Sequence, residues 1–262
     1  MDETWVRLGP AALPPAEAVA LPIRLLDGMG PGGPPVLSWS TVTAPGLVLG
    51  RHAVDPDLDR DAVAAEGVTV AKRSSGGGPV LWDGDLVALD VVLPRGHRLA
   101  ADDVVAAYRW LGEALADALR ALGVPGVEVV DVARARAAAA APGAAADACF
   151  GGLSPWEVLA GGRKVVGLSQ TRRHPGALLQ AGVPLRLDAA RLGRLLGRDD
   201  AWAQALAATA AGVREMAPDV TAADVVAAVE AAITAREGVA LDGTRSAGPG
   251  SSGRGAHPSG EG

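Results

Sequence analysis

The sequence predicts an α+β domain with a mixed, largely antiparallel sheet flanked by helices. Short apolar and β-branched runs often follow one another directly, without the helix that a doubly wound parallel sheet places between strands. The longest helical pattern comes after the central runs. Hydrophobic residues make up 49% of the 262 residues and charged residues 21%, which is enough apolar material for a sizeable core. We therefore expect one large domain with short appendages.

The beginning of this domain is expected to hold a helix followed by two strands. An amphipathic pattern predicts a helix over residues 14–29, and the breaker GPGGPP follows it. Two runs rich in apolar and β-branched residues, 36–43 and 46–50, are split by Ala44-Pro45. They predict two strands that are joined tightly.

The middle of the chain continues with both kinds of element. Acidic residues in the first turn predict a helix over 55–66, and VTVAKR predicts a strand over 68–73. Residues 85–93 are nearly all apolar and predict a buried strand. A helix is expected over 102–122 and ends at Gly123, because apolar residues recur at three- or four-residue steps: Val104, Tyr108, Leu111, Leu115, Leu119 and Leu122.

Strands and a low-complexity segment follow. Residues 127–132 predict a strand, and the Ala/Gly/Pro-rich stretch 133–148 predicts an irregular loop in which the alanines could form a helical turn. Two apolar runs around Gly161-Gly162 predict a hairpin of residues 155–160 and 163–170. A further strand is expected over 177–187.

The last part of the chain is expected to be helical and then disordered. Residues 188–237 carry helical patterns, the last of them opened by Thr221 as an N-cap. From Gly243 onward no apolar face remains. The domain boundaries predicted from these patterns are an N-terminal extension over 1–15, the main domain over 16–237 and a disordered tail over 238–262.

Charge and composition exclude several classes of function. A net charge of -6 argues against a nucleic-acid binder, which needs a basic face. No apolar run reaches the length of a membrane span, and the N-terminus lacks the pattern of a secretory signal. The single cysteine fits a reducing compartment, so we expect a cytoplasmic protein without membrane association.

A glycine-rich loop is the most specific local feature. In AKRSSGGGPVLWDGDL, Gly76, Gly77 and Gly78 lie between two expected strands, where a ligand can approach the backbone and N-H groups can face an oxygen. Arg73 would add a permanent cation. The simpler interpretation is a flexible turn.

Two further features carry reactive groups. Lys164 interrupts an apolar strand, so its ammonium should lie against protein and could bind a carbonyl oxygen, although an edge-strand lysine that prevents aggregation is common. Cys149 precedes it by fifteen residues and could act as a nucleophile if deprotonated, although a lone cysteine is more often a small buried hydrophobe. No metal site is expected.

The two motifs together resemble those of a known superfamily. RSSGGGPVLWDGDL resembles the lipoate-protein ligase signature RRxSGGGAVYHDxGNL, and GRKVVGLSQTRR resembles GRKIxGxAQxR, in the same order and at similar spacing. The resemblance covers roughly residues 16–237 and implies the mixed sheet that this superfamily shares with biotin-protein ligases. It also implies catalytic roles for Cys149 and Lys164. The residues that it implies for acyl binding are Arg73, Ser75, Gly76, Gly77, Gly78, Pro79, Val80, Leu81, Gly167, Ser169 and Gln170.

The cysteine segment distinguishes between two reactions of the superfamily. ACFGGLSPWEV resembles the corresponding segment of cysteine-dependent octanoyltransferases, and the Arg-Asn-Asp element of ATP-dependent ligases is absent. The resemblance therefore implies transfer of an octanoyl or lipoyl group from acyl carrier protein through acyl-Cys149, with no cofactor. The alternatives are an ATP-dependent and Mg-dependent lipoate-protein ligase and a non-catalytic acyl-binding homologue. Pro79, Trp82 and Ala181 depart from the family pattern.

The resemblance also implies a protein acceptor. The expected acceptor is a lipoyl-domain protein or a glycine-cleavage H-type protein, which presents the lysine to be modified. Lipoyl domains are commonly acidic, so a basic group is the candidate docking patch, with an ordinary solvated loop as the simpler interpretation. This group consists of Arg163, Arg172, Arg173 and His174.

Overall fold

The computed structural model describes residues 3–53 and 58–245. Its strands are β1 (Glu3–Leu13), β2 (Val36–Val42), β3 (Gly46–Leu49), β4 (Thr69–Lys72), β5 (Val80–Trp82), β6 (Leu86–Pro94), β7 (Val127–Val129), β8 (Val158–Ala160), β9 (Arg163–Arg173), β10 (Gly176–Pro184) and β11 (Val239–Arg245). Its α-helices are α1 (Pro15–Asp27), α2 (Arg60–Ala65), α3 (Arg109–Ala121), α4 (Val132–Ala140), α5 (Ala189–Leu195), α6 (Asp200–Thr209) and α7 (Ala222–Glu237). Short 3-10 helices occupy Ala106–Tyr108 and Val213–Glu215.

A large mixed sheet forms the centre of the molecule. Its eight strands lie in the order β11-β1-β2-β6-β10-β9-β8-β7. The pairs β11-β1 and β1-β2 are parallel, and every other neighbouring pair is antiparallel. A smaller sheet has the order β4-β3-β5. The predicted fold class, a mixed and largely antiparallel sheet flanked by helices, is confirmed.

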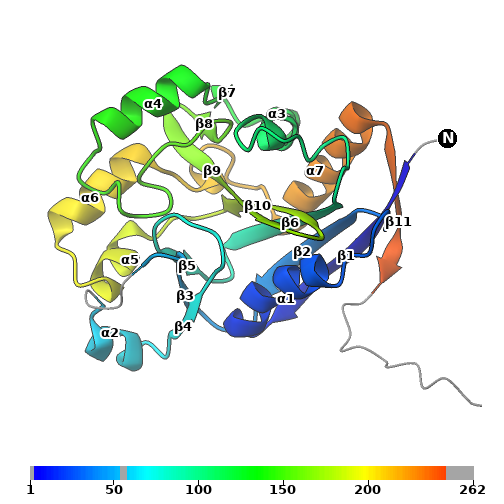
Figure 1. Cartoon of the computed structure of the whole chain (residues 1–262). Helices are drawn as coiled ribbons and strands as arrows, with labels where there is room; N and C mark the ends of the chain where they lie inside the picture. Colours follow the sequence, from blue (N-terminus) through cyan, green and yellow to red (C-terminus); the bar gives the residue numbers. More distant parts are fainter. Residues whose placement is uncertain (1–2, 54–57, 246–262) are drawn as a thin grey trace, which may run out of the picture.

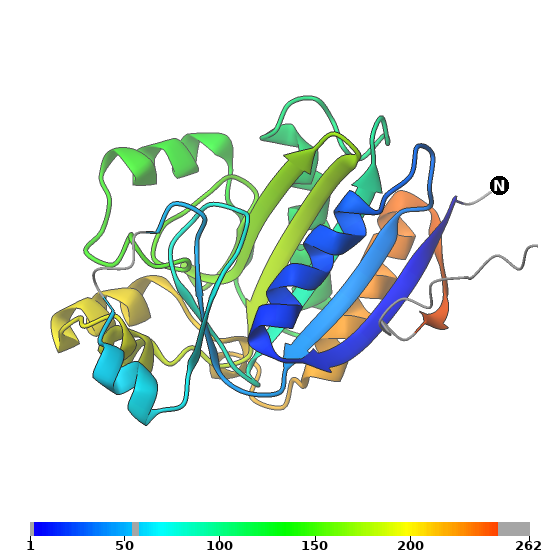
Figure 2. The same cartoon turned by 60° about the horizontal axis from the view of Figure 1, so that its bottom comes forward.

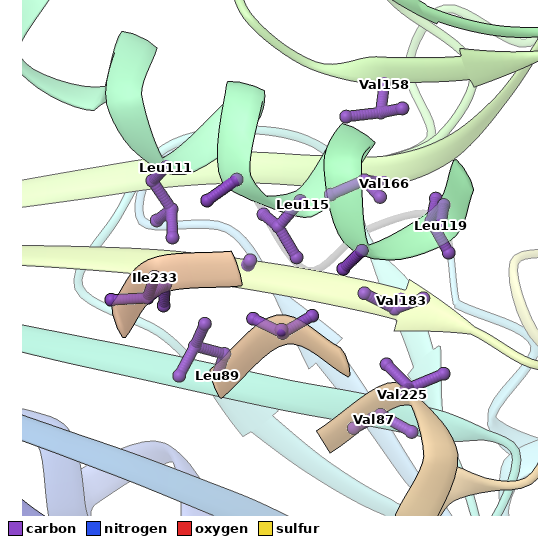
Figure 3. Close-up of a cluster of buried hydrophobic side chains, with 14 of the residues drawn as sticks. Val87, Leu89, Leu111, Leu115, Leu119, Val158, Val166, Val183, Val225 and Ile233 are labelled. Atoms are coloured by element: carbon purple, nitrogen blue, oxygen red, sulfur yellow. The ribbon is translucent and has the colours of Figure 1, made fainter. Parts of the chain in front are cut away.

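Helices cover the two faces of the large sheet. Helices α3 and α7 pack side by side on one face, and α1 lies across β2, β6 and β10 on the other (Figures 1 and 2). Because side chains alternate along a strand, Val87, Leu89 and Val91 of β6 face the α3-α7 layer. There they join Leu111, Leu115 and Ile233 in the main core (Figure 3). Ala88 and Asp90 lie on the opposite face of β6, where they line a cavity together with residues of α1.

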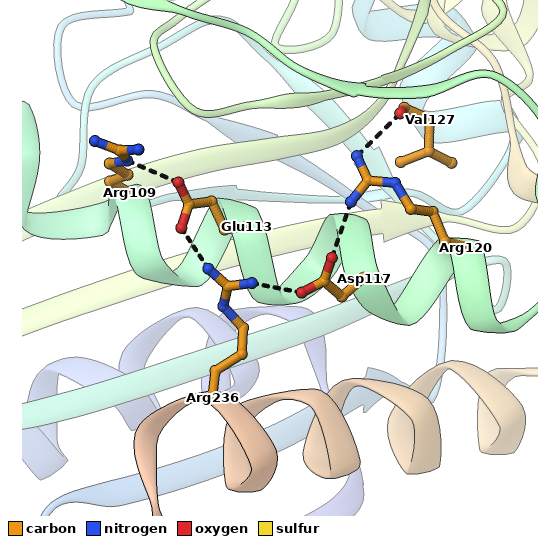
Figure 4. Close-up of polar contacts among 6 residues, drawn as sticks. All are labelled: Arg109, Glu113, Asp117, Arg120, Val127 and Arg236. Carbon is orange, nitrogen blue, oxygen red and sulfur yellow. Dashed lines mark hydrogen bonds and ion pairs between the residues drawn. The ribbon is translucent and has the colours of Figure 1, made fainter.

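Charged side chains link the exposed sides of α3 and α7. Arg236 of α7 forms ion pairs with Glu113 and Asp117 of α3, and these acids also pair with Arg109 and Arg120 (Figure 4). This network lies outside the apolar contact between the two helices. It therefore adds to a packing that the hydrophobic residues already define.

The structure has strands in both segments that were predicted to flank the main domain. The expected extension over 1–15 contains β1, and the expected tail over 238–262 contains β11, which pairs with β1 in parallel. Gly9 and Pro10 interrupt β1 and Gly243 interrupts β11, so their sequence pattern alone is weak. Their pairing with each other and with β2 supplies the missing stabilisation. Residues 246–262 of the expected tail lie outside the described residues.

Several local elements also differ from the predictions. The expected loop over 133–148 begins with α4, which Asp131 caps by accepting a hydrogen bond from the Arg134 N-H. The expected helix over 102–122 has its α-helical part only from Arg109, and Val104 is exposed. The two runs expected as tightly joined strands, β2 and β3, belong to different sheets. The glycine loop is followed by β5, a strand that the pattern did not predict.

Candidate active site

A cavity of about 250 Å³ lies between the large sheet, helix α1 and two loops. Strands β6, β9 and β10 form its floor, and α1 contributes Ala18, Val19 and Ile23. The loops are the glycine loop, residues 73–79, and the loop of residues 146–154, which we call the nucleophile loop because it carries Cys149, the nucleophile expected from the sequence. The lining is mostly apolar, with a few polar groups, as in sites for small organic ligands. The candidate site residues that line it are Arg73, Gly76, Gly77, Gly78, Val80, Cys149, Lys164, Gly167 and Ser169.

Arg73 fixes the conformation of the glycine loop. Its Nη2 donates to the carbonyl oxygens of Gly76 and Gly78 at 2.9 and 3.0 Å. A trans peptide group points its C=O and the following N-H to opposite sides, so the Gly77 N-H points away from the guanidinium. Within the described part of the chain, the N-H groups of Gly76, Gly77 and Gly78 have no hydrogen-bond acceptor. These N-H groups are available to an oxygen of a ligand.

The glycine loop packs directly against the nucleophile loop. A Cβ atom added at Gly78 would lie 1.8 Å from the Asp147 carbonyl oxygen, so only glycine fits there. One residue further, the Pro79 carbonyl oxygen accepts a hydrogen bond from the Cys149 N-H at 3.0 Å. The position of Cys149 at the cavity wall is therefore set by the glycine loop.

Lys164 holds the nucleophile loop from the sheet side. Its side chain is 2% exposed, and Nζ donates to the carbonyl oxygens of Cys149 and Gly152 at 2.8 and 2.9 Å. Nζ also pairs with Glu157 Oε1 at 2.8 Å, and Glu157 is equally buried. The prediction that the ammonium lies against protein is confirmed. An ammonium has three N-H groups, so these three acceptors use all of them.

The cation in hydrogen-bonding contact with the sulfur is Arg73. Its Nη2 lies 3.9 Å from Cys149 Sγ. The Lys164 ammonium lies on the carbonyl side of the same residue and also over the Phe150 ring, 5.5 Å from the centroid. Cys149 thus has the Arg73 guanidinium at its sulfur and the Lys164 ammonium at its carbonyl oxygen.

A row of polar side chains crosses the cavity floor. Asp90, Gln180 and Ser169 are neighbours on β6, β10 and β9, and Ser75 of the glycine loop lies above them. Gln180 donates to Asp90 Oδ1 at 2.7 Å and accepts from the Ser75 hydroxyl at 3.2 Å. The Ser169 hydroxyl donates to Ser75 Oγ at 3.2 Å. Burial raises the pKa of Asp90 to about 7, and the Gln180 hydrogen bond opposes this only partly.

Four residues expected to bind the acyl group do not line this cavity. Gln170 is next to Ser169 on β9 and faces the other side of the sheet, where it donates to the Val104 carbonyl oxygen. Leu81 lies on β5 with its side chain at a smaller neighbouring pocket. Ser75 is a buried residue of the glycine loop whose hydroxyl donates to Gln180, and Pro79 contributes its carbonyl oxygen to Cys149. The role predicted for the Gln170 side chain in the floor was wrong.

The predicted docking group is not one patch. Arg163 and Arg173 are the first and last residues of β9, an eleven-residue strand, so about 33 Å separates them. Arg163 pairs with Glu215, and Arg173 pairs with Asp27. Arg172 donates to Gln170 and to the Ala101 carbonyl oxygen, while His174 is exposed. These residues are close in sequence, but the length of β9 separates Arg163 from the other three.

Sequence reasoning missed Glu157, Asp90 and the role of Gln180. Glu157 interrupts the apolar run PWEVLA, and Asp90 interrupts DLVALDVVL. A carboxyl group in a strand that is otherwise buried is itself a signal of a polar partner or a ligand. Trp82 and Ala181, where the sequence departs from the family pattern, both line the cavity.

The described residues contain no group of three or more His, Cys, Asp or Glu side chains arranged to hold a metal ion. In the same residues, no helix combines the length and the hydropathy that crossing a bilayer would need.

Comparison with known proteins places this geometry in a family. Residues 14–234 match the lipoyl protein ligase A/B catalytic domain. The chain is 32% identical over 189 residues to octanoyltransferase LipM of Exiguobacterium sp., covering 71% of this chain and 67% of that protein. It is 34% identical over 182 residues to octanoyltransferase LipM of Moorella thermoacetica, covering 69% and 64%. The match thus spans about two thirds of the length of these relatives.

Solved structures share the fold. A bipartite lipoate protein ligase from Thermoplasma acidophilum superposes with a TM-score of 0.74 at 19% identity, covering 94% of this chain and 88% of that one. A lipoate-protein ligase A bound with ATP gives a TM-score of 0.71 at 20% identity, covering 93% and 89%. The family match over most of the chain, together with these similarities, shows that the protein belongs to the lipoyl protein ligase A/B catalytic domain family.

Proposed function

We propose that this protein transfers an octanoyl group from acyl carrier protein to a lysine of a lipoyl-domain or H-type protein, with Cys149 as the nucleophile. The observation that carries the proposal is the place of Cys149. Its side chain lines an apolar cavity beside Arg73, and the same cavity is lined by Gly76 to Gly78, whose N-H groups have no protein acceptor among the described residues. The relatives named octanoyltransferase support the acyl group and the reaction class.

The reaction proceeds in two thioester-based steps. The Cys149 thiolate attacks the carbonyl carbon of the donor thioester, and the carbon-sulfur bond to the donor breaks, so that the donor leaves as a thiolate that takes up a proton. The neutral amine of the acceptor lysine then attacks the acyl-Cys149 carbonyl carbon. An amide forms, a proton leaves the nitrogen, and the Cys149 sulfur is released. No nucleotide is consumed.

The cavity residues have separate roles in these steps. The apolar lining takes the acyl chain, and the N-H groups of Gly76 to Gly78 receive the oxygen that becomes negative in the tetrahedral intermediate. Arg73 keeps those N-H groups oriented and places a positive charge near the sulfur. Lys164 fixes the nucleophile loop through the carbonyl oxygens of Cys149 and Gly152.

The decisive experiment is an intact-mass measurement with and without ATP. Octanoyl-acyl carrier protein should add one octanoyl mass to the wild type, the adduct should be released by hydroxylamine, and Cys149→Ser should not form it. An equally labelled Cys149→Ser variant would refute the cysteine mechanism. Acyl-adenylate formed from ATP and free octanoate or lipoate would establish ligase chemistry instead. A protein that neither loads nor modifies a lipoyl domain would be the non-catalytic homologue.

We further predict that Arg172 and Arg173 contribute to acceptor docking. Reversing both to Glu should slow modification of an acidic lipoyl domain about tenfold or more at low salt, since rim charges mainly affect association. Formation of acyl-Cys149 from a small thioester should stay unchanged. Arg163→Glu, at the other end of β9, is the matched control. Equal acceptor kinetics in the double variant and the control would remove the docking role.

A further inference from the structure

Asp90 is a buried carboxyl group in the wall of an apolar cavity. It is 3% exposed, and apolar residues such as Ala88 and Ala181 line the same cavity. Gln180 donates to Oδ1 at 2.7 Å. Within residues 3–53 and 58–245, Oδ2 has no hydrogen-bond partner, and neither oxygen forms an ion pair. A buried carboxyl with half of its acceptor capacity unused is costly unless a ligand or a proton completes it.

No charged group near Asp90 compensates for this cost. The cavity-lining residues of α1 are Ala18, Val19 and Ile23, while Glu17 and Arg24 of that helix are exposed. The neighbours of Asp90 across the sheet are Ser38 and Gln180. The charged groups elsewhere in the lining have partners of their own: Arg73 donates to Gly76 and Gly78, and Lys164 pairs with Glu157.

Asp90 lies away from the reacting atoms. From Lys164 to Ser169 the chain advances about 16 Å along β9, and Asp90 is two strands further across the sheet, about 10 Å. The cavity lining includes both Asp90 and Cys149. An acyl chain that extends from Cys149 through this cavity reaches Asp90 with its distal carbons. The carboxyl is therefore placed to select among acyl chains and lies outside the bonds that react.

We propose that Asp90 determines which acyl chains the cavity accepts: a saturated chain requires the protonated carboxyl, whereas a chain with a hydroxyl group reaching Oδ2 is accepted with the carboxyl charged. This inference rests on the proposed acyl transfer and names the specificity residue of its acyl site. The physical reason is that alkyl groups cannot replace the water that solvates a carboxylate, whereas a hydroxyl can donate to it. Gln180 holds Oδ1, so the selection is made at Oδ2.

The titration of Asp90 should make binding of acyl chains depend on pH. Burial raises the pKa of this group to about 7, so the carboxyl is largely neutral at pH 6 and charged at pH 8.5 in the free protein. Binding of a saturated chain should therefore weaken as pH rises through neutrality. Binding of a suitably hydroxylated chain should weaken less.

The test measures equilibrium binding of uncharged amides, which cannot react with Cys149. Octanamide and a set of hydroxyoctanamides, with the hydroxyl at carbons 5 to 8, are titrated calorimetrically at pH 6 and pH 8.5. For the wild type, we expect octanamide affinity to fall about tenfold or more between these pH values, and at least one hydroxyoctanamide to bind about tenfold better than octanamide at pH 8.5. Asp90→Asn should remove both effects while keeping the Gln180 hydrogen bond. Glu17→Gln, an exposed carboxyl-to-amide change on α1, should keep both.

Two results would overturn the inference. One is a wild type whose octanamide affinity is independent of pH or that binds no amide of the set. The other is an Asp90→Asn variant that keeps the wild-type pH dependence and preference. Because these ligands carry no thioester, the outcome is separate from acyl transfer. Retained selectivity in a protein that never forms acyl-Cys149 would refute the proposed function and leave this inference standing.

Discussion

Lys164 and Glu157 form a buried pair whose members also bind backbone groups. The Lys164 ammonium serves the carbonyl oxygens of Cys149 and Gly152, and the Glu157 carboxylate accepts from the N-H groups of Ser154 and Leu168. The pair thus joins the nucleophile loop to β9. A charge left alone at such a site is far more costly than the pair itself.

This arrangement predicts that Lys164 affects the stability of the protein and the loading of Cys149 in ways that two variants can distinguish. Lys164→Met should lower the free energy of unfolding by about 3–5 kcal/mol, since Glu157 stays buried without its partner. The double variant Lys164→Met, Glu157→Met should recover much of this loss but not acyl loading. Urea unfolding and intact-mass loading measure the two quantities. Full loading by the double variant would show that Lys164 does not matter to the reaction.

Asp90 should make the stability of the protein depend on pH. The pKa is raised from 3.8 to about 7, so the folded state holds a proton that the unfolded state releases between these values. We compare the free energy of unfolding of the wild type with that of Asp90→Asn. The wild type is most stable relative to the variant below about pH 4. It loses at most roughly 4 kcal/mol of this relative stability as pH rises to about 7, and does not regain it above that pH. Thermal unfolding checks this: the melting temperature of Asp90→Asn should exceed that of the wild type by more at pH 8 than at pH 4.5. An equal difference at both pH values would contradict the burial of an uncompensated carboxyl.

At the level of elements, the contact between the glycine loop and the nucleophile loop places the sulfur. Gly78 touches the Asp147 carbonyl, and Pro79 holds the Cys149 N-H. Arg73 spans the glycine loop from below through two of its carbonyl oxygens. Both loops must therefore keep their shapes for Cys149 to reach the cavity.

Gly78→Ala tests this dependence. The added Cβ would overlap the Asp147 carbonyl oxygen, so the nucleophile loop must shift, and we expect acyl loading to fall about a hundredfold, as for other small displacements of reacting groups. Gly84→Ala, where a Cβ meets nothing within 4 Å, is the control and should load normally. Loading rates are followed by intact mass. Normal loading by Gly78→Ala would mean that this contact does not position Cys149.

At the level of the whole molecule, the two ends of the described chain complete the sheet. Strand β11 covers the edge of β1, and β1 in turn pairs with β2 (Figure 1). Trp5 of β1 is fully buried and contacts Trp110 of α3 edge to face. The N-terminal strand therefore belongs to the main core, and β11 covers the edge of this core strand and is itself the outermost strand on that side.

Truncation after Glu237 should therefore destabilise the protein. The loss of β11 exposes the β1 edge, and we expect a melting temperature lower by about 5 °C or more, together with aggregation at high concentration. Truncation after Arg245, which keeps every residue of β11, is the comparison. Thermal unfolding and light scattering measure the effects. The same melting temperature for both truncations would show that β11 contributes nothing to stability.

Much of the architecture could be predicted because it depends on residues close together in sequence. The Gly161-Gly162 turn between β8 and β9 was predicted, and both glycines have positive φ. The Thr221 N-cap of α7 and the end of α3 near Gly123 were also predicted. Turn and cap signals act within a few residues, so the sequence carries them directly. The motifs likewise indicated the family through runs of adjacent residues.

Tertiary structure decided what the side chains of those motifs contact. Strand order brings Glu157 to Lys164 and aligns Asp90 with Gln180, although ninety residues separate the latter two in sequence. Strand length separates Arg163 from Arg172, and alternation along β9 turns Gln170 away from the cavity. By itself, the sequence determined the reactive residue types and those elements that local turn, cap and periodicity signals mark. The register and pairing of distant strands determined which of these residues share one cavity, because such contacts depend on the global packing of the sheet.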